Sequence, residues 1–344
     1  MTDDQDTQVG FHRMALRLTL GVGGAFLISQ IWPWPLSYVM PVFVALLLQE
    51  KHPMTYRAGI GAVGLAWLLM AIGYGMAVIL TPFPVLFLAA ATFLLWSLYM
   101  FMLTSGAPML AVVGGIIGAL VIPVLVPNLP DVARSVTIGL MFNTLVALLI
   151  TQVAFLLVPP LPNTPTEAKP LPSREMAASM ASKLVVAIGP IMAVFLLFGL
   201  TDILLLSVAA MIALSMGAKG GWSMGMGLVI ANLAYGGVVM LLFYEATVIA
   251  PVLPLFLATS FFVVWIFASR IAQGTAKSAM WSSALTGFLI LSGSIMLATD
   301  VDAGQKFATR VGQLLAAALY VALAFQTVDL LSSVLKSRSN REAP

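Results

Sequence analysis

Uninterrupted apolar runs follow one another along almost the whole chain, and they constrain the fold more than any other feature. A helix needs about 20 apolar residues to cross a hydrocarbon core of about 30 Å, and it satisfies its own backbone hydrogen bonds there. A membrane β-barrel would instead show strands in which apolar and polar residues alternate. The runs predict an all-α polytopic membrane protein with about twelve transmembrane helices, near residues 14–33, 35–49, 58–80, 84–104, 107–127, 135–158, 180–199, 202–216, 222–244, 249–268, 278–298 and 308–335.

Charged residues are too scarce for a water-soluble domain. Of the 344 residues, 61% are hydrophobic and 8% are charged, whereas soluble proteins carry roughly 25% charged residues. The absence of cysteine excludes thiol chemistry and cysteine-ligated metals. The sequence also lacks an HExxH motif, a phosphate-binding loop and a nucleophile elbow. We therefore expect no enzyme activity, no cofactor or metal, and no nucleic-acid partner.

A proline-rich segment divides the chain near its midpoint. Residues 159–179 favour an extended, solvated linker between a first unit, 1–158, and a second unit, 180–344. Features of the first unit recur at an offset of 166 residues: Arg17 aligns with Lys183, Gly59 with Gly225, and Gly61 with Gly227. Such an offset is typical of internal duplication. Because six spans per unit is an even number, the two six-helix repeats are predicted to enter the membrane from the same side and lie parallel.

Lysine and arginine set the predicted orientation. All of the 16 cations except Arg134, Lys306 and Arg310 fall on one side of the predicted spans. The positive-inside rule makes that side the cytoplasm, so both termini and the linker are predicted to be cytoplasmic.

The second span of each unit is unusually short. Residues 35–49 and 202–216 each give about 22 Å of helix at 1.5 Å per residue, and the first of them contains Pro41. Short or proline-interrupted segments at matching positions of two halves point to a substrate path in transporters. The alternative is an ordinary span that local thinning of the bilayer accommodates.

Ionisable residues in or beside the apolar runs are the next candidates, because charge in lipid is costly. Arg17 and Lys183 open the first span of each unit. They are expected either to attract an anionic substrate or to serve as ordinary positive-inside anchors. For proton coupling the candidate carboxylates are Asp202, Asp329 and Glu50, although the simpler explanation of Asp202 is that it caps the helix that follows it.

Uncharged polar residues and glycines inside the spans predict helix contacts. Gln152 and Gln326 occupy comparable places late in the sixth spans, where each is expected to form an interhelical hydrogen bond or, alternatively, to contact substrate. Asn143 and Asn232 carry the same default expectation. The glycine patterns, among them 21–24, 59–64 and 114–118, indicate close helix packing.

The order of features in the first unit resembles the fusaric acid resistance and aromatic acid exporter family, including a short two-repeat branch known only as a domain of unknown function. A cation opens span one, an aromatic-proline break follows at 32–35, and a turn at 55–57 leads into a Gly-x-Gly pair. The matching positions are Arg17, Tyr38, Pro41, Gln49, Arg57, Gly59 and Gly61. The second unit departs from this pattern, since it has Lys219-Gly220 where the first has the Thr-x-Arg turn.

This resemblance implies an efflux permease in the inner membrane of Gram-negative bacteria. It implies export of aromatic carboxylic acids or related toxic compounds, driven by the proton gradient and often beside a periplasmic membrane-fusion adaptor. The implied partners are thus the lipid bilayer, a small anionic aromatic substrate and the adaptor. A homo-oligomer is left open.

Two other functions stay open at this stage. An uncoupled anion channel of the same helical architecture would also use cationic mouths, and the family resemblance extends toward six-helix plant anion channels. A structural subunit of a membrane complex is the third alternative.

Overall fold

Helices make up the secondary structure of the described part of the chain, which confirms the predicted all-α class. The computed structural model describes residues 2–50, 52–160, 171–200, 227–228, 230–249, 252–275 and 277–296, with scattered positions between 309 and 327. No strand occurs within these ranges. The predicted span 202–216 lies outside the described residues, as does most of the predicted span 308–335.

The first unit contains four long helices and several shorter ones. Its elements are α1 (Thr2–Ile31), the 3₁₀ turn η1 (Ser37–Val39), α2 (Met40–Leu48), α3 (Tyr56–Leu80), α4 (Pro84–Ser105), α5 (Met109–Ile116), the π-helical segment η2 (Ile117–Val121), α6 (Ile122–Leu125) and α7 (Pro130–Leu157). After the linker follow α8 (Arg174–Leu197), the π-helical segment η3 (Ala231–Gly236), α11 (Gly237–Ile249), α12 (Leu253–Ala272) and α13 (Ser278–Met296).

Local sequence sets several helix ends. The side chains of Thr55 and Ser173 accept hydrogen bonds from backbone N–H groups of the first turns of α3 and α8, as N-cap residues do. Proline begins α4 and α7, where its missing N–H leaves no hydrogen bond unmade. Gly106 ends α4 in the left-handed conformation that favours glycine.

Six helices in the described ranges are long and apolar enough to cross a membrane. They are the 8–31 part of α1, and α3, α4, α7, α8 and α12. The segments Ser37–Leu48, Met109–Leu125 and Ala234–Ile249 are apolar but shorter. The predicted number of about twelve spans therefore stays a prediction. The start of the first helix also differs from the prediction, since α1 begins at Thr2 instead of residue 14.

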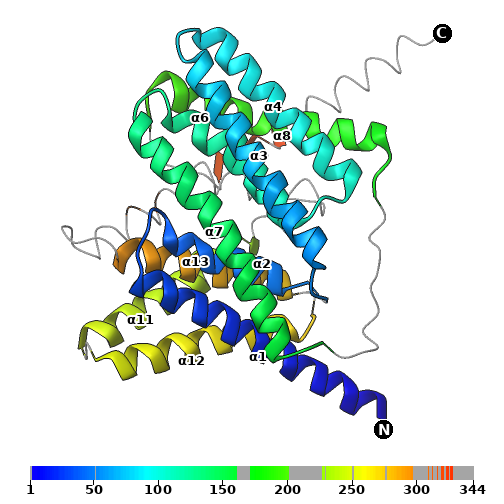
Figure 1. Cartoon of the computed structure of the whole chain (residues 1–344), viewed down its shortest axis with the longest axis vertical. Helices are drawn as coiled ribbons and strands as arrows, with labels where there is room; N and C mark the ends of the chain where they lie inside the picture. Colours follow the sequence, from blue (N-terminus) through cyan, green and yellow to red (C-terminus); the bar gives the residue numbers. More distant parts are fainter. Residues whose placement is uncertain are drawn as a thin grey trace.

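The helices pack in two groups that α3 and α7 connect (Figure 1). In one group α1 packs along α12, with α11 and α13 beside them. In the other, α4 packs along α8. α7 contacts α1, α2 and α3, so it joins the groups. The first helix after the linker thus lies against the first unit, while α1 lies against a helix of the second unit.

Glycine residues allow α3 to approach α5 and η2 closely. A Cβ atom at Gly73 of α3 would overlap the carbonyl oxygen of Gly118 in η2, and a Cβ at Gly118 would overlap the backbone of α3 at Leu69. Gly114 faces Ala66 in the same way. The expected close packing at 114–118 is confirmed. In the other two patterns, close packing is found at Gly21, Gly23 and Gly59. A Cβ at Gly24, Gly61 or Gly64 would meet no atom within 4 Å.

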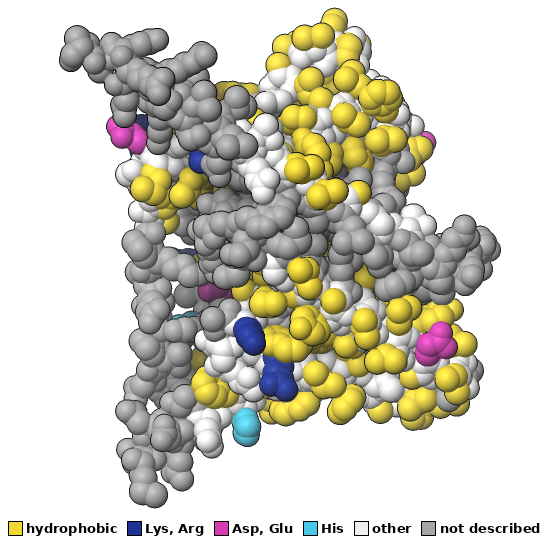
Figure 2. Space-filling model, turned by 180° about the vertical axis from the view of Figure 1, so that it is seen from behind, with side chains coloured by type: hydrophobic (Ala, Val, Ile, Leu, Met, Phe, Trp, Pro, Cys, Tyr) yellow, Lys and Arg dark blue, Asp and Glu magenta, His cyan; other side chains and the backbone are white. Residues whose placement is uncertain are grey.

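Large hydrophobic side chains cover the outside of the helices. Figure 2 shows them over much of the coloured part of one face. On α3 and α4 the strongly exposed residues are Ile60, Leu68, Ile79, Val85, Leu86 and Phe93. Continuous apolar surface of this kind is unfavourable in water and favourable against acyl chains. The long apolar helices and their exposed side chains indicate a protein embedded in a membrane.

Candidate functional site

The joint between α1 and α2 is a sharp turn held by α7. Leu36 has φ 58° and ψ 27°, and it is the only non-glycine residue with positive φ in the described ranges. Asn143 of α7 holds the turn from both sides: Trp34 Nε1 donates a hydrogen bond to Asn143 Oδ1 at 2.7 Å, and Asn143 Nδ2 donates to the Leu36 carbonyl at 2.8 Å. Gly139, one turn earlier on α7, gives room to the carbonyl of Pro35. The break expected at 32–35 is therefore held in place by hydrogen bonds, and Asn143 bonds to this turn and not to another helix.

Replacing Asn143 with leucine should loosen this joint. Asn143 is fully buried, and the variant would leave the Trp34 indole N–H without a partner and remove one of the two hydrogen bonds that the Leu36 carbonyl accepts. We expect a loss of about 2 kcal/mol of stability, measured as a lower unfolding temperature in detergent. Thr92→Val is the control, because the Thr92 hydroxyl bonds only to the Leu88 carbonyl of its own helix. Equal losses in both variants would contradict the role assigned to Asn143.

Arg17 is buried deep in α1. Only 3% of its surface is exposed. It lies about 21 Å along the helix from Ile31 at 1.5 Å per residue. With Ile31 at one membrane surface, Arg17 falls inside a hydrocarbon layer of about 30 Å. A snorkelling anchor would keep its charged group in water, so the burial favours the first of the two expectations for Arg17.

The guanidinium of Arg17 rests on an aromatic ring instead of a carboxylate. Its Cζ lies 4.0 Å from the centroid of the Phe155 ring on α7. Its Nε has no hydrogen-bond partner, and within the described ranges no aspartate or glutamate pairs with it. A buried cation without a counter-ion is costly. An entering carboxylate would offset that cost, because Nε and a neighbouring Nη form an edge that binds a carboxylate through two hydrogen bonds.

Arg17 lies near the C-terminal ends of α2 and α7. One turn after Arg17, the position of Gly21 touches Leu48 at the end of α2 and Ala154 of α7. Thr151 lies one turn before Phe155 on the same face of α7, it is buried, and its hydroxyl has no partner. This α1–α2–α7 junction therefore combines an uncompensated cation, an aromatic ring and an unpaired hydroxyl.

The residues predicted for the substrate path lie at different places. Gln49 and Gln152 are near the α1–α2–α7 junction, but their amides are occupied: Gln49 Nε2 donates to the Ala45 carbonyl and Gln152 Nε2 to the Met54 carbonyl, each at 2.9 Å. Tyr38 lies at the other end of the η1–α2 segment, where it packs against Gly293 of α13. Pro41 is buried in the first turn of α2. The Gln152 bond therefore reaches the loop between α2 and α3 and not another helix, and the roles expected of these residues stay predictions.

The remaining predicted residues are Lys183, Gln326, Glu50, Asp202 and Asp329. Lys183 is half-buried in α8, and Gln326 is exposed. Glu50 is exposed just after α2. Asp202 and Asp329, the other proton-coupling candidates, lie outside the described residues.

Phe155 and Thr151 are the site residues that the sequence did not indicate. Phe155 is 138 positions from Arg17 in the chain, and a phenylalanine in an apolar helix has nothing that marks it as a cation partner. Thr151 precedes Gln152 directly, so the polar pair Thr-Gln late in the sixth span was the available signal.

No protein-family model, curated protein or solved structure matches this chain. The family resemblance of the first unit and the activity that it implies therefore stay predictions.

Proposed function

We propose that this protein is a membrane permease for small anions, and that Arg17 binds the anionic group during transport. The observation that carries this proposal is the burial of Arg17 inside a membrane-embedded helix bundle without a carboxylate partner in the described residues. Intramembrane charges that persist at such cost generally mark substrate or ion pathways.

The proposed substrate class is aromatic carboxylic acids or related toxic compounds. A carboxylate suits the open edge of the guanidinium. The Phe155 ring beside it offers apolar and stacking contacts to an aromatic body. The resemblance to the aromatic acid exporters points to the same class, and with it to export across a bacterial inner membrane beside a periplasmic adaptor.

The proposed architecture is two parallel six-helix repeats with cytoplasmic termini, about twelve spans in all. At the offset of 166 residues, the 8–31 part of α1 corresponds to 174–197, the bounds of α8. By the same offset, α4 corresponds to 250–271, close to α12 at Leu253–Ala272. The contact of α1 with α12 and the contact of α8 with α4 are then equivalent contacts between corresponding helices of the two units. A two-fold axis along the membrane normal would produce this reciprocity.

Proton coupling is the proposed driving force, with Asp202, Asp329 and Glu50 as candidates. Coupling needs a group whose charge changes as access alternates. Of the three, Glu50 is the one the described residues include, and it lies near the α1–α2–α7 junction at the end of α2.

An uncoupled anion channel is the second candidate function. The observation that favours it is that buried Arg17 has no carboxylate partner among the described residues. A channel needs a cation that attracts the anion, but it needs no group that titrates.

Transport by the purified full-length protein in proteoliposomes tests the proposal and separates these two functions. We expect uptake of radiolabelled benzoate or salicylate that rises several-fold when a pH gradient is imposed, and none of a matched neutral compound such as benzamide. Uptake that is unchanged when the gradient is removed, together with steady current in a planar bilayer, would favour the channel. Absence of both uptake and current would overturn the proposal that the protein moves these anions.

A further inference from the structure

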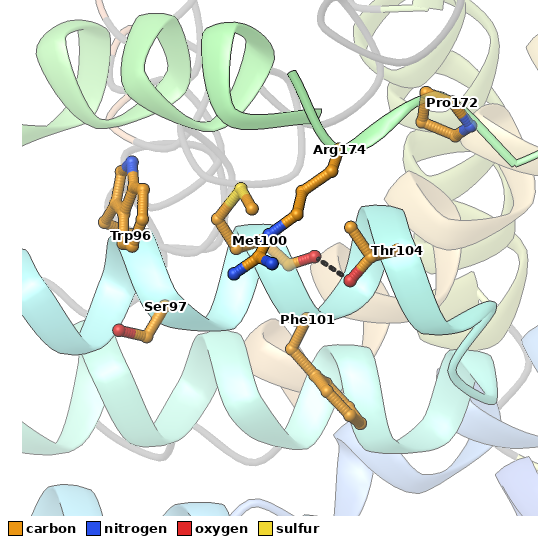
Figure 3. A pocket seen from close by; sticks show the side chains of 7 residues that line it. All are labelled: Trp96, Ser97, Met100, Phe101, Thr104, Pro172 and Arg174. Atoms are coloured by element: carbon orange, nitrogen blue, oxygen red, sulfur yellow. Dashed lines mark hydrogen bonds between the residues drawn. The ribbon is translucent and has the colours of Figure 1, made fainter. Parts of the chain in front are cut away.

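An open groove of about 550 Å³ runs along the contact between α4 and α8. Figure 3 shows the side chains that line it: Trp96, Ser97, Met100, Phe101 and Thr104 from α4, and Pro172 and Arg174 from the start of α8. The two helices run antiparallel here, because the end of α4 lies beside the beginning of α8. The groove is therefore lined by both apolar and polar side chains, and the guanidinium of Arg174 lies over Met100 (Figure 3).

The two ends of the groove differ in chemistry. At one end Trp96 Nε1 donates a hydrogen bond to Ser182 Oγ of α8 at 3.2 Å. At the other end, Arg174 is exposed and its side chain reaches over Met100 (Figure 3). The Thr104 hydroxyl donates to the Met100 carbonyl of its own helix. Arg174 is the cation that lines the groove, and its neighbour Glu175 does not line it.

The groove opens onto the surface that faces lipid. Phe93 and Phe101 on α4 are exposed, as are Met176 and Val186 on α8. Arg174 is the first residue of its helix, so it stands at the level where an apolar span meets the membrane surface. A phospholipid with an acyl chain in the groove would place its phosphate at that level.

The contact between α1 and α12 is tightly filled at Gly23. There the ring of Phe261 lies 2.7 Å from where a Cβ of Gly23 would be, so the ring fills the space beside the glycine. At the same offset of 166, Gly189 of α8 has no atom within 4 Å of that position. The residue that aligns with Arg174 is Gln8, which carries no charge. The two helix contacts therefore differ at these two pairs of aligned positions.

We propose that the α4–α8 groove binds one anionic phospholipid, with its phosphate on Arg174 and an acyl chain along Met100 and Phe101. A cation at the membrane surface attracts anionic lipid, and the apolar floor fixes the chain. This site is separate from Arg17 and does not depend on the transport function.

Native mass spectrometry of the full-length protein with added phosphatidylglycerol or phosphatidylcholine tests the site. We expect one retained phosphatidylglycerol in preference to phosphatidylcholine. Arg174→Gln should weaken that binding about fivefold without changing phosphatidylcholine binding. Ser97→Trp, which fills the groove, should reduce retention of both lipids. The control is Arg57→Gln, which removes an exposed cation from the first turn of α3.

Three results would overturn the proposal: no preference for phosphatidylglycerol, equal effects of Arg174→Gln and Arg57→Gln, or full retention of the lipid by Ser97→Trp. Each variant must first elute as the wild type does on size exclusion. If Ser97→Trp does not, Ser97→Phe replaces it. None of these results bears on benzoate uptake, so failure of the lipid site is distinguishable from failure of the permease proposal.

Discussion

Replacing Arg17 with glutamine should abolish anion uptake while leaving the fold intact or more stable. A charge-assisted hydrogen bond to a carboxylate is worth about 1.5–3 kcal/mol, so we expect apparent affinity for benzoate to fall about 10- to 100-fold. Arg17 has no carboxylate partner in the described residues. Removing the Arg17 charge therefore leaves no buried carboxylate without a partner, and it also removes the buried cation that had no counter-ion.

The combination of lost uptake and unchanged unfolding temperature is the informative outcome. Arg13→Gln is the matched control, because Arg13 lies one turn earlier on the same helix and is exposed. Arg17→Lys should recover only part of the affinity, since an ammonium cannot form the two-bond fork of a guanidinium. If Arg17→Gln unfolds the protein, or transports as well as Arg13→Gln does, Arg17 is a structural residue and the substrate site lies elsewhere.

Replacing Gly73 with alanine should produce the largest loss of stability of any single methyl addition in α3. The new methyl group would overlap the Gly118 carbonyl. This carbonyl belongs to the backbone of η2, so it cannot rotate out of the way as the end of a flexible side chain can. The two helices would have to separate, at an expected cost of about 3 kcal/mol. Thermal unfolding in detergent measures the change.

Gly75→Ala is the matched control within the same helix. A Cβ at Gly75 meets no atom within 4 Å, so alanine there should be neutral or stabilise α3 by about 0.5–1 kcal/mol through helix propensity. Equal destabilisation by the two substitutions would show that the α3–η2 contact is not what makes Gly73→Ala costly.

Hydropathy predicted the class of the protein and the place of several helices, because it responds directly to the lipid environment. It also located the short, broken segment around Pro41, which the structure resolves into η1 and α2. It did not predict the start of α1. Hydropathy marks the part of a helix that matches the membrane, whereas the helix itself continues through Asp3, Asp4 and Asp6, acidic residues that favour a helix N-terminus.

The sequence predicted only some of the residues of the α1–α2–α7 junction. Arg17 is conspicuous as a charge in an apolar run. Its contact with Phe155 depends on which helices are neighbours, and apolar helices do not reveal their neighbours because lipid is as apolar as leucine. Leu36 was equally hidden, since the left-handed conformation usually goes to glycine and here depends on hydrogen bonding by Asn143.

The partnership of α1 with α12 has a consequence for biosynthesis. About 220 residues separate the end of α1 from the start of α12, and ribosomes add about 5–20 residues per second. The nascent chain therefore holds its first helix for roughly 10–40 s before the helix that covers it has been made. During that interval α1, with the charge of Arg17, lies in an incomplete helix bundle. An insertase or chaperone that covers α1 until α12 has been made would assist the folding of every new copy.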